Sequence, residues 1–248
     1  ASLDLLVRII SITPILSLSG PEDPWLFFYE DFLSVYDPKL RKDIGAYYTP
    51  IEVVQAQVRL IEHLLINRLN KRMGFTDPEV ITLDPAVGTG TYILTVIDHS
   101  LKRIAKEQGS GAVSGQAGML AENLYGFEIL VGPYAVTDLR VSRALKDYGA
   151  NLPEEGPHIY LTDTLESPNT ELPRLPFYLK PIAEQHAKAL NVKRKVPVLV
   201  CLGNPPYDRH KASSDTNHSS TGGWIRYGDE LSEEIGRASC RERVCHRV

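Results

Sequence analysis

The chain has 248 residues, of which 43% are hydrophobic and 23% charged, and its formal net charge is −4. These values fit a soluble globular protein with one large or two small domains. No apolar run reaches the roughly 18–20 residues of a transmembrane helix, so we expect no membrane partner, and the cysteine usage predicts a reducing, cytoplasmic setting. The acidic balance argues against a complete DNA-binding surface in this chain, because such surfaces carry an excess of lysine and arginine.

Cysteine and histidine give no sign of a metal site. The three cysteines form no CxxC pair and the seven histidines are scattered, so the sequence predicts that no metal is bound. Cys201 lies in the apolar run 198–202 and is expected to be a buried small hydrophobic residue. For the short basic patch of Lys193, Arg194 and Lys195, a solvated turn is favoured over a DNA contact.

The first part of the chain is predicted to be helical. Residues 1–40 are expected to form a helical lead-in, whose aromatic-rich part packs on the domain that follows. Residues 51–72 carry apolar side chains every three or four positions, which predicts an amphipathic helix. Gly74 is expected to end this helix.

Short apolar strands then alternate with helices. Strands are expected at residues 80–83, 124–127, 158–161 and 196–202, and helices at 92–106 and 134–148. This alternation predicts an α/β fold with a parallel sheet covered by helices on both faces. Residues 109–118 and 212–223 are rich in glycine and serine and are expected to be mobile loops.

The last residues break with this pattern. From Ile235 onward there are four arginines against one glutamate and no hydrophobic periodicity. Residues 235–244 resemble a sequencing adapter translated in one frame. We therefore expect residues 235–248 to be foreign to the protein and the native sequence to run out near residues 229–234.

A Gly-rich turn joins the first predicted strand to the next helix, with the sequence Asp84-Pro85-Ala86-Val87-Gly88-Thr89-Gly90. Gly88 and Gly90 allow a ligand to approach the backbone closely. The turn lacks the Gly-Lys-Ser/Thr ending of a triphosphate-binding loop. Asp84 at the strand end favours a cationic or hydroxyl-bearing ligand over a phosphate. The alternative is a tight turn with a structural role only.

Two further carboxylates follow predicted strands. Glu128 ends the second strand, where a carboxylate can accept the ribose hydroxyls of an adenosine ligand. Asp163 follows the third strand and could accept a hydrogen bond from an adenine amino group, or serve as a helix N-cap. By itself each position is compatible with an ordinary strand end.

The most specific signal is Asn204-Pro205-Pro206-Tyr207, which comes after the fourth strand. The prolines fix φ and remove backbone donors, so the Asn204 side-chain oxygen and the Pro205 carbonyl form a stiff pair of acceptors. Such a pair suits an exocyclic NH₂ group, which has two protons to donate. Tyr207 offers a face on which a planar base can stack.

In this order the motifs resemble those of the S-adenosylmethionine-dependent amino-methyltransferases. Gly45-Ala46-Tyr47-Tyr48-Thr49-Pro50 precedes the Gly-rich turn and looks like that family's cofactor-capping motif. This arrangement is that of the gamma class of DNA adenine-N6 methyltransferases, and the wider sequence looks most like the methyltransferase region of type ISP restriction–modification enzymes. The resemblance implies a Rossmann-like methyltransferase fold.

The resemblance also implies roles for individual residues. S-adenosylmethionine is the implied cofactor, and the implied reaction is methyl transfer to the N6 amino group of an adenine flipped out of DNA. The residues implied to bind the cofactor are Tyr48, Thr49, Pro50, Asp84, Pro85, Ala86, Gly88, Gly90, Glu128 and Asp163. The implied catalytic residues are Asn204, Pro205, Pro206 and Tyr207.

On this basis residues 41–234 would be part of a methyltransferase domain, cut after the fourth of seven strands. Double-stranded DNA would be bound through a target-recognition domain beyond this chain, and the resemblance allows nuclease and helicase domains in the same native protein. We expect the fragment alone to be poorly soluble, because its fourth strand has an uncovered edge, and inactive on DNA.

Three other functions remain open from the sequence. An enzyme with the same Asn-Pro-Pro-Tyr motif could methylate a protein glutamine or an RNA base, although such enzymes generally lack the Tyr-Tyr-Thr-Pro element. The chain could instead be a non-catalytic, cofactor-binding module of a larger restriction complex. The plainest alternative is a nucleotide-binding Rossmann domain without the methyltransferase chemistry.

Overall fold

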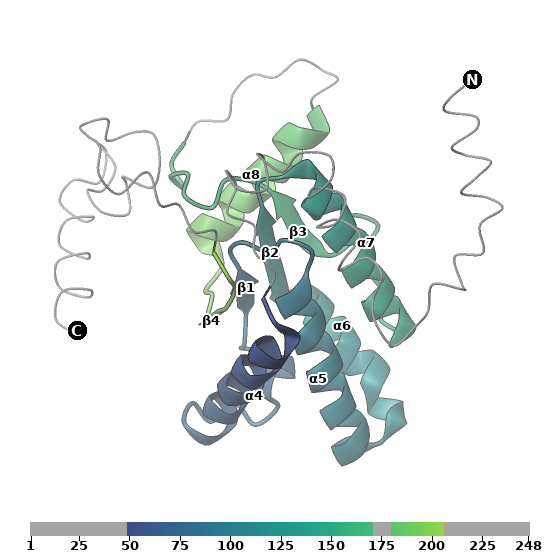
Figure 1. Cartoon of the computed structure of the whole chain (residues 1–248). Helices are drawn as coiled ribbons and strands as arrows, with labels where there is room; N and C mark the ends of the chain where they lie inside the picture. Colours follow the sequence, from purple (N-terminus) through teal and green to yellow (C-terminus); the bar gives the residue numbers. More distant parts are fainter. Residues whose placement is uncertain (1–48, 171–179, 206–248) are drawn as a thin grey trace, which may run out of the picture. The chain divides into compact units, whose positions relative to one another are not determined.

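The structure, a computed structural model, describes residues 49–170 and 180–205 (Figure 1). Its helices are α4 (Ile51–Asn67), α5 (Thr91–Gln108), α6 (Val113–Asn123), α7 (Val131–Asp147) and α8 (Lys180–Lys195), with short 3-10 turns η2 (Gly74–Thr76) and η3 (Ser110–Ala112). Its strands are β1 (Thr82–Asp84), β2 (Leu124–Glu128), β3 (His158–Leu161) and β4 (Val200–Cys201). The expected helical lead-in and the tail 235–248 lie outside the described residues, so the domain boundaries stay predictions.

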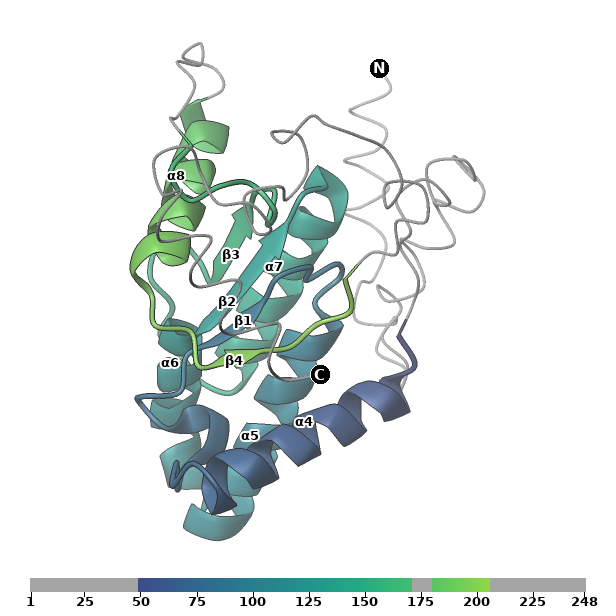
Figure 2. The same cartoon turned by 90° about the vertical axis from the view of Figure 1, so that its left-hand side faces the viewer.

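The described strands form one parallel sheet in the order β3-β2-β1-β4 (Figure 2). Strand β1 pairs on one side with β2, where Asp84 lies opposite Gly126, and on the other with β4, where Leu83 lies opposite Cys201. Because all strands point the same way, the loops that follow them emerge at one edge of the sheet. The predicted Rossmann-like α/β fold is confirmed, and β3 has the predicted bounds.

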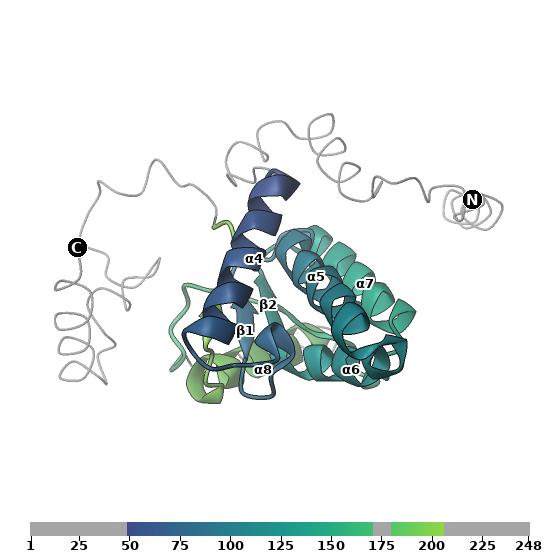
Figure 3. The ribbon, with the colours of Figure 1, turned by 90° about the horizontal axis from the view of Figure 1, so that it is seen from below.

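Helices cover both faces of this sheet. Figure 3 shows α4, α5 and α7 on one side and α8 on the other. The larger core lies under the first group and includes Ile93, Ile97 and Leu101 of α5, all nearly inaccessible to solvent. A smaller cluster on the other face joins Phe127 of β2 to Ala189 and Val192 of α8. The strand order explains these two layers, because right-handed crossovers in opposite directions along a sheet place their helices on opposite faces.

Among the described residues, strand β4 lies at the edge of the sheet and is covered on one face only. Val200 and Leu202 are buried in the larger core, whereas Leu199 and Cys201 are exposed. Side chains alternate between the faces of a strand, and α8 packs over β2 and β3 rather than over β4. The expectation that Cys201 is a buried hydrophobic residue is therefore wrong.

The predicted loop at residues 109–118 is also wrong, because this segment enters η3 and then α6. Its apolar side chains recur at helical spacing, and Ala117, Leu120 and Ala121 are buried. Their burial offsets the low helix propensity of Gly115 and Gly118, which costs about 1 kcal/mol per residue. The second predicted loop, residues 212–223, lies outside the described part of the chain.

The basic patch of Lys193, Arg194 and Lys195 is the last turn of helix α8 and not a loop turn, and Arg194 and Lys195 are exposed to solvent as expected. Positive charge at this end of a helix complements the helix dipole. The Lys193 ammonium donates to the carbonyls of Asp163 (2.6 Å) and Glu166 (3.1 Å). Burial lowers the pKa of Lys193. The patch therefore fastens α8 to the loop after β3.

The predicted helix 51–72 is confirmed as α4, but it ends earlier than expected, at Asn67. Asn70 takes a left-handed conformation (φ 55°), and the amides of Leu69 and Lys71 return to the carbonyls of Leu64 and Leu65. Gly74 does not end the helix but opens η2. A Cβ on Gly74 would lie 2.6 Å from the Glu62 carboxylate, so a larger residue there would strike Glu62.

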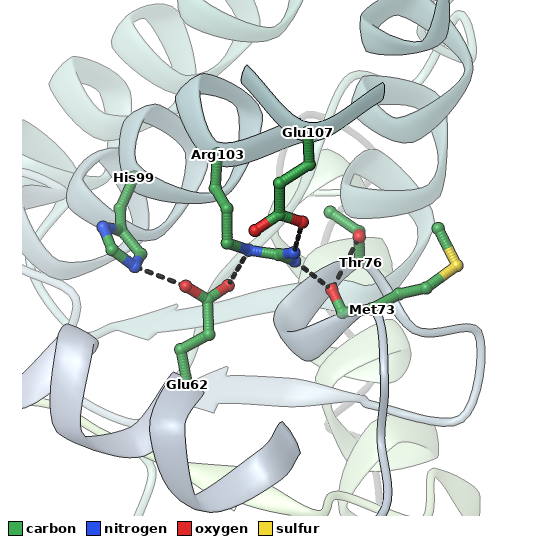
Figure 4. Close-up of polar contacts among 6 residues, drawn as sticks. All are labelled: Glu62, Met73, Thr76, His99, Arg103 and Glu107. Atoms are coloured by element: carbon green, nitrogen blue, oxygen red, sulfur yellow. Dashed lines mark hydrogen bonds and ion pairs between the residues drawn. The ribbon is translucent and has the colours of Figure 1, made fainter. Parts of the chain in front are cut away.

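A buried ionic cluster joins the carboxyl-terminal half of α4 to α5 (Figure 4). Glu62 is only 4% exposed, and its carboxylate lies against the His99 imidazole and 3.2 Å from the Arg103 Nε. Arg103 also donates to the Met73 carbonyl and pairs with Glu107, each at 2.6 Å. The Arg103 guanidinium therefore links α4, α5 and the turn before η2.

Within the two described stretches, no helix combines the length and the apolar character needed to cross a bilayer.

Replacing Glu62 with alanine should lower the free energy of unfolding by about 3–5 kcal/mol, since it leaves Arg103 and His99 without their buried carboxylate. Urea denaturation of the 248-residue chain, followed by circular dichroism, measures this loss. Glu107→Ala is the matched control, because Glu107 pairs with the same arginine but is half-exposed, and should cost about 1 kcal/mol or less. Equal losses in the two variants would contradict a buried clamp at Glu62.

Candidate functional site

The Gly-rich turn between β1 and α5 takes a shape that only glycine adopts easily. Gly88 (φ 55°) and Gly90 (φ 88°) both have left-handed backbone conformations, and Gly90 is the N-cap of α5. The amide of Val87 donates to the Phe127 carbonyl at 2.9 Å, which ties the turn to β2. A Cβ on Gly90 would come within 3.1 Å of Thr137 on α7. The turn is thus held between β2 and α7.

Asp84 is completely buried at the end of β1. One carboxylate oxygen accepts the amide hydrogen of Ala86 at 3.0 Å, and the other has no hydrogen-bond partner among the described residues. Burial raises the pKa of Asp84 to about 7, against the opposing effect of the Ala86 bond and with a further contribution from the charge of Glu128. A buried carboxylate with a free oxygen is a feature of ligand sites.

The loop after β4 lies directly against this carboxylate. A Cβ on Gly203 would sit 2.4 Å from the Asp84 Oδ1, so glycine is required for the backbone to approach this closely. Asn204 follows at once and is partly buried, whereas Pro205 is exposed. Two motifs more than a hundred residues apart in sequence are therefore in contact.

Glu128 ends β2 and is 8% exposed. Its carboxylate accepts three backbone N–H groups, from Gly88, Ile129 and Leu130, each at 2.9 Å. Burial raises the pKa of Glu128, and these three bonds oppose the rise. Since an ionised carboxylate has about four acceptor positions, three are used within the protein. Glu128 therefore fixes the Gly-rich turn as well as facing the same edge of the sheet.

Asp163 follows β3, and its Oδ1 accepts the Leu165 amide hydrogen at 2.8 Å. This bond closes a local turn of the kind formed by aspartate side chains. No helix begins at Asp163 in the described residues, so the helix N-cap predicted as an alternative is wrong, and this oxygen caps a turn instead. The neighbouring Thr164 hydroxyl donates to the Pro85 carbonyl, which connects this loop to the Gly-rich turn.

The predicted capping motif meets the predicted base-binding motif in the structure. The Asn204 Nδ2 donates to the Thr49 Oγ1 at 2.9 Å, across 155 residues of sequence. Thr49 precedes Pro50, the N-cap residue of α4. Tyr48, Pro206 and Tyr207 lie outside the described residues. No group of three or more His, Cys, Asp or Glu side chains that could hold a metal ion occurs in the described stretches.

A family model for N-6 DNA methylases matches residues 26–229. The chain belongs to the N-6 DNA methylase family. No curated protein matches the chain.

Among solved structures, the N-6 methylase chain resembles the ATP-dependent type ISP restriction–modification enzyme LlaBIII bound to DNA, with 25% identity and a TM-score of 0.61 over 77% of this chain. It also resembles a DrdV–DNA complex, with 26% identity and a TM-score of 0.55 over 76% of this chain. A nuclease-deletion mutant of the type ISP enzyme LlaGI, at 24% identity and a TM-score of 0.58 over 83%, shares the fold. The predicted likeness to type ISP enzymes is confirmed.

This N-6 methylase chain covers only a small part of those proteins. It spans 12% of the LlaBIII chain and 16% of the DrdV and LlaGI chains.

Three residues that support the Gly-rich turn were not predicted. The Thr137 hydroxyl donates to the Gly88 carbonyl at 2.5 Å, Arg140 donates to the Thr89 carbonyl, and Thr164 donates to the Pro85 carbonyl. Thr137 and Arg140 are one turn apart on α7. No local sequence pattern marks them, because their partners are backbone carbonyls about 50 residues away.

Asp84→Asn should stabilise the ligand-free chain, and more at pH 8 than at pH 5. The pKa of Asp84 is about 7 in the folded state against 3.8 for an ordinary aspartate. The neutral Asp84 carboxyl group therefore leaves the free energy of unfolding undiminished below pH 3.8. As the pH rises through 7 and the group ionises, the free energy of unfolding falls by up to roughly 4 kcal/mol, at 1.36 kcal/mol per pKa unit. Asparagine removes this loss because it does not ionise.

Urea denaturation of both proteins at the two pH values measures the effect. Asp147→Asn is the control, because Asp147 is exposed at the end of α7. A gain from Asp84→Asn that is the same at pH 5 and pH 8 would contradict the raised pKa of Asp84.

Proposed function

We propose that this chain is the front part of the catalytic domain of a DNA adenine-N6 methyltransferase that uses S-adenosylmethionine and works within a restriction–modification enzyme. The observation that carries the proposal is the contact of the Gly203–Asn204–Pro205 loop with Asp84 and Thr49. Membership of the N-6 DNA methylase family and likeness to a type ISP enzyme bound to DNA support it.

The residues at this edge of the sheet fit S-adenosylmethionine. Gly88 and Gly90 leave the backbone of the turn open to a ligand, and one oxygen of the buried Asp84 carboxylate has no partner within residues 49–170 and 180–205. Glu128 retains about one acceptor position, which suits a ribose hydroxyl. We assign Tyr48, Thr49 and Pro50 to the methionine end and Asp163 to the adenine. The cofactor supplies a methyl group made electrophilic by its sulfonium.

Asn204 and Pro205 are the proposed groups that act on the target base. The Asn204 Oδ1 and the Pro205 carbonyl each accept one hydrogen of the adenine N6 amino group, which directs the nitrogen lone pair toward the methyl group. With the cofactor bound, the amino nitrogen would bond to the methyl carbon as the sulfonium S–C bond breaks, and it would give up one proton to solvent. Pro206 stiffens the loop, and Tyr207 is assigned to stacking on the flipped base. Positioning supplies most of the rate enhancement.

The proposal places recognition of the DNA sequence outside this chain. A net charge of −4 provides no excess of lysine and arginine for DNA phosphates, and the chain spans only 12–16% of the structures it resembles. We assign residues 1–40 to a helical lead-in, 41–234 to part of the methyltransferase domain and 235–248 to an adapter artefact. Target-recognition, nuclease and helicase domains are the proposed partners in the native protein.

Asn204→Ala should reduce methyl transfer to DNA by about 100-fold or more while leaving the affinity for S-adenosylmethionine within about threefold, because Asn204 holds the target amino group and not the cofactor. The test uses the full native reading frame that contains this sequence. Single-turnover assays with labelled cofactor measure transfer, and calorimetry measures binding. Equal losses of transfer and of cofactor affinity would contradict the role given to Asn204.

A further inference from the structure

Thr49 lies where the cofactor-capping segment meets the base-binding loop. Its hydroxyl oxygen accepts the Asn204 Nδ2 hydrogen at 2.9 Å, and both residues are partly buried. An asparagine amide has a donor end and an acceptor end on the same flat group, so holding one end fixes where the other end points. The Asn204 Oδ1 therefore points away from Thr49.

Both partners of this bond are fixed to the same framework. On one side, α4 is fastened to α5 by the Tyr92 hydroxyl, which donates to the Gln57 Oε1 at 2.6 Å, and by the Glu62–Arg103 cluster (Figure 4). On the other side, β4 pairs with β1, and Gly203 packs on Asp84. The bond therefore spans two rigid anchors.

We propose that Thr49 is a positioning residue for Asn204: its hydroxyl holds the amide nitrogen so that the amide oxygen faces the amino group to be methylated. This inference rests on the proposed function. Methyl transfer to nitrogen needs an acceptor oxygen at that place, and an amide turned the other way would present its NH₂ group instead. Two N–H donors would then face the amino hydrogens of the base and repel it.

Positioning and cofactor capping make different predictions for the same variant. If Thr49 only closes over the cofactor, its loss weakens cofactor binding, and saturating cofactor restores the rate. If Thr49 orients Asn204, the rate at saturating cofactor and DNA falls, because misplacement of a group at the reacting centre slows the chemical step itself.

The experiment uses the full native reading frame and compares Thr49→Val, which replaces the hydroxyl with a methyl group, with Thr49→Ser, which keeps the hydroxyl. Single-turnover rates are measured at saturating S-adenosylmethionine and DNA, and cofactor affinity is measured separately. Thr49→Val should slow transfer at saturating cofactor by about tenfold or more, beyond any loss of cofactor affinity, and Thr49→Ser should recover most of the rate. Thr95→Val, which removes a hydroxyl bonded within α5, should leave the rate unchanged.

A double-variant comparison isolates the pair. In an Asn204→Ala background, Thr49→Val should cause no further loss, because the group it positions is absent. The inference is overturned if Thr49→Val transfers at the parent rate, loses only cofactor affinity, or matches Thr49→Ser. Retained cofactor binding shows that a slow variant is folded, and Thr49→Ala replaces the valine variant if that binding is lost. If the parent protein transfers no methyl group to adenine, the proposed function fails, whatever the variants do.

Discussion

The parallel pairing of β1 with both β2 and β4 is the constraint on which the site depends. A central strand bonded on both sides fixes where three chain segments end. It brings Asp84, Glu128 and Asn204, which are far apart in sequence, to one edge of the sheet. The close approach of Gly203 to the Asp84 carboxylate follows from this register, since Leu83 lies opposite Cys201 and the two residues come one and two positions later.

The protein itself holds the site in shape through its backbone groups. Thr137, Arg140 and Thr164 hold the carbonyls of the Gly-rich turn, and Glu128 holds its Gly88 amide. Asp84 is the exception, because it is buried and one of its oxygens finds no partner in the part of the chain that the structure describes. Such a carboxylate costs stability in the ligand-free protein, and local costs of this kind concentrate at functional sites.

The sequence predicted those features that arise from local patterns. Apolar runs located β2 and β3 to within one residue, and helical spacing located α4, α5 and α7. The Gly-rich turn and Glu128 were found because they follow strands, and parallel strands direct their ends to one place. The approach of Thr49 to Asn204 was not predicted, although both residues were identified, since nothing local specifies a contact over 155 residues.

Other features depend on tertiary packing and could not be predicted locally. The exposure of Cys201 reflects which strands α8 covers, and an apolar run does not show whether one or both faces are buried. Helix α6 forms in a glycine-rich stretch because Ala117 and Leu120 find a core. Helix α8 was not predicted either, and its basic end was assigned to a turn. The carbonyls that Lys193 contacts lie in the loop after β3, so no local pattern indicates them.

The most direct test of the central claim is to identify the methylated product. The protein encoded by the full native reading frame is incubated with unmodified DNA and S-adenosylmethionine carrying a labelled methyl group. The DNA is then digested to nucleosides and analysed by mass spectrometry. Our account predicts the label on N6-methyladenine alone. Label on N4-methylcytosine with unlabelled adenine, or DNA without any label, would contradict it.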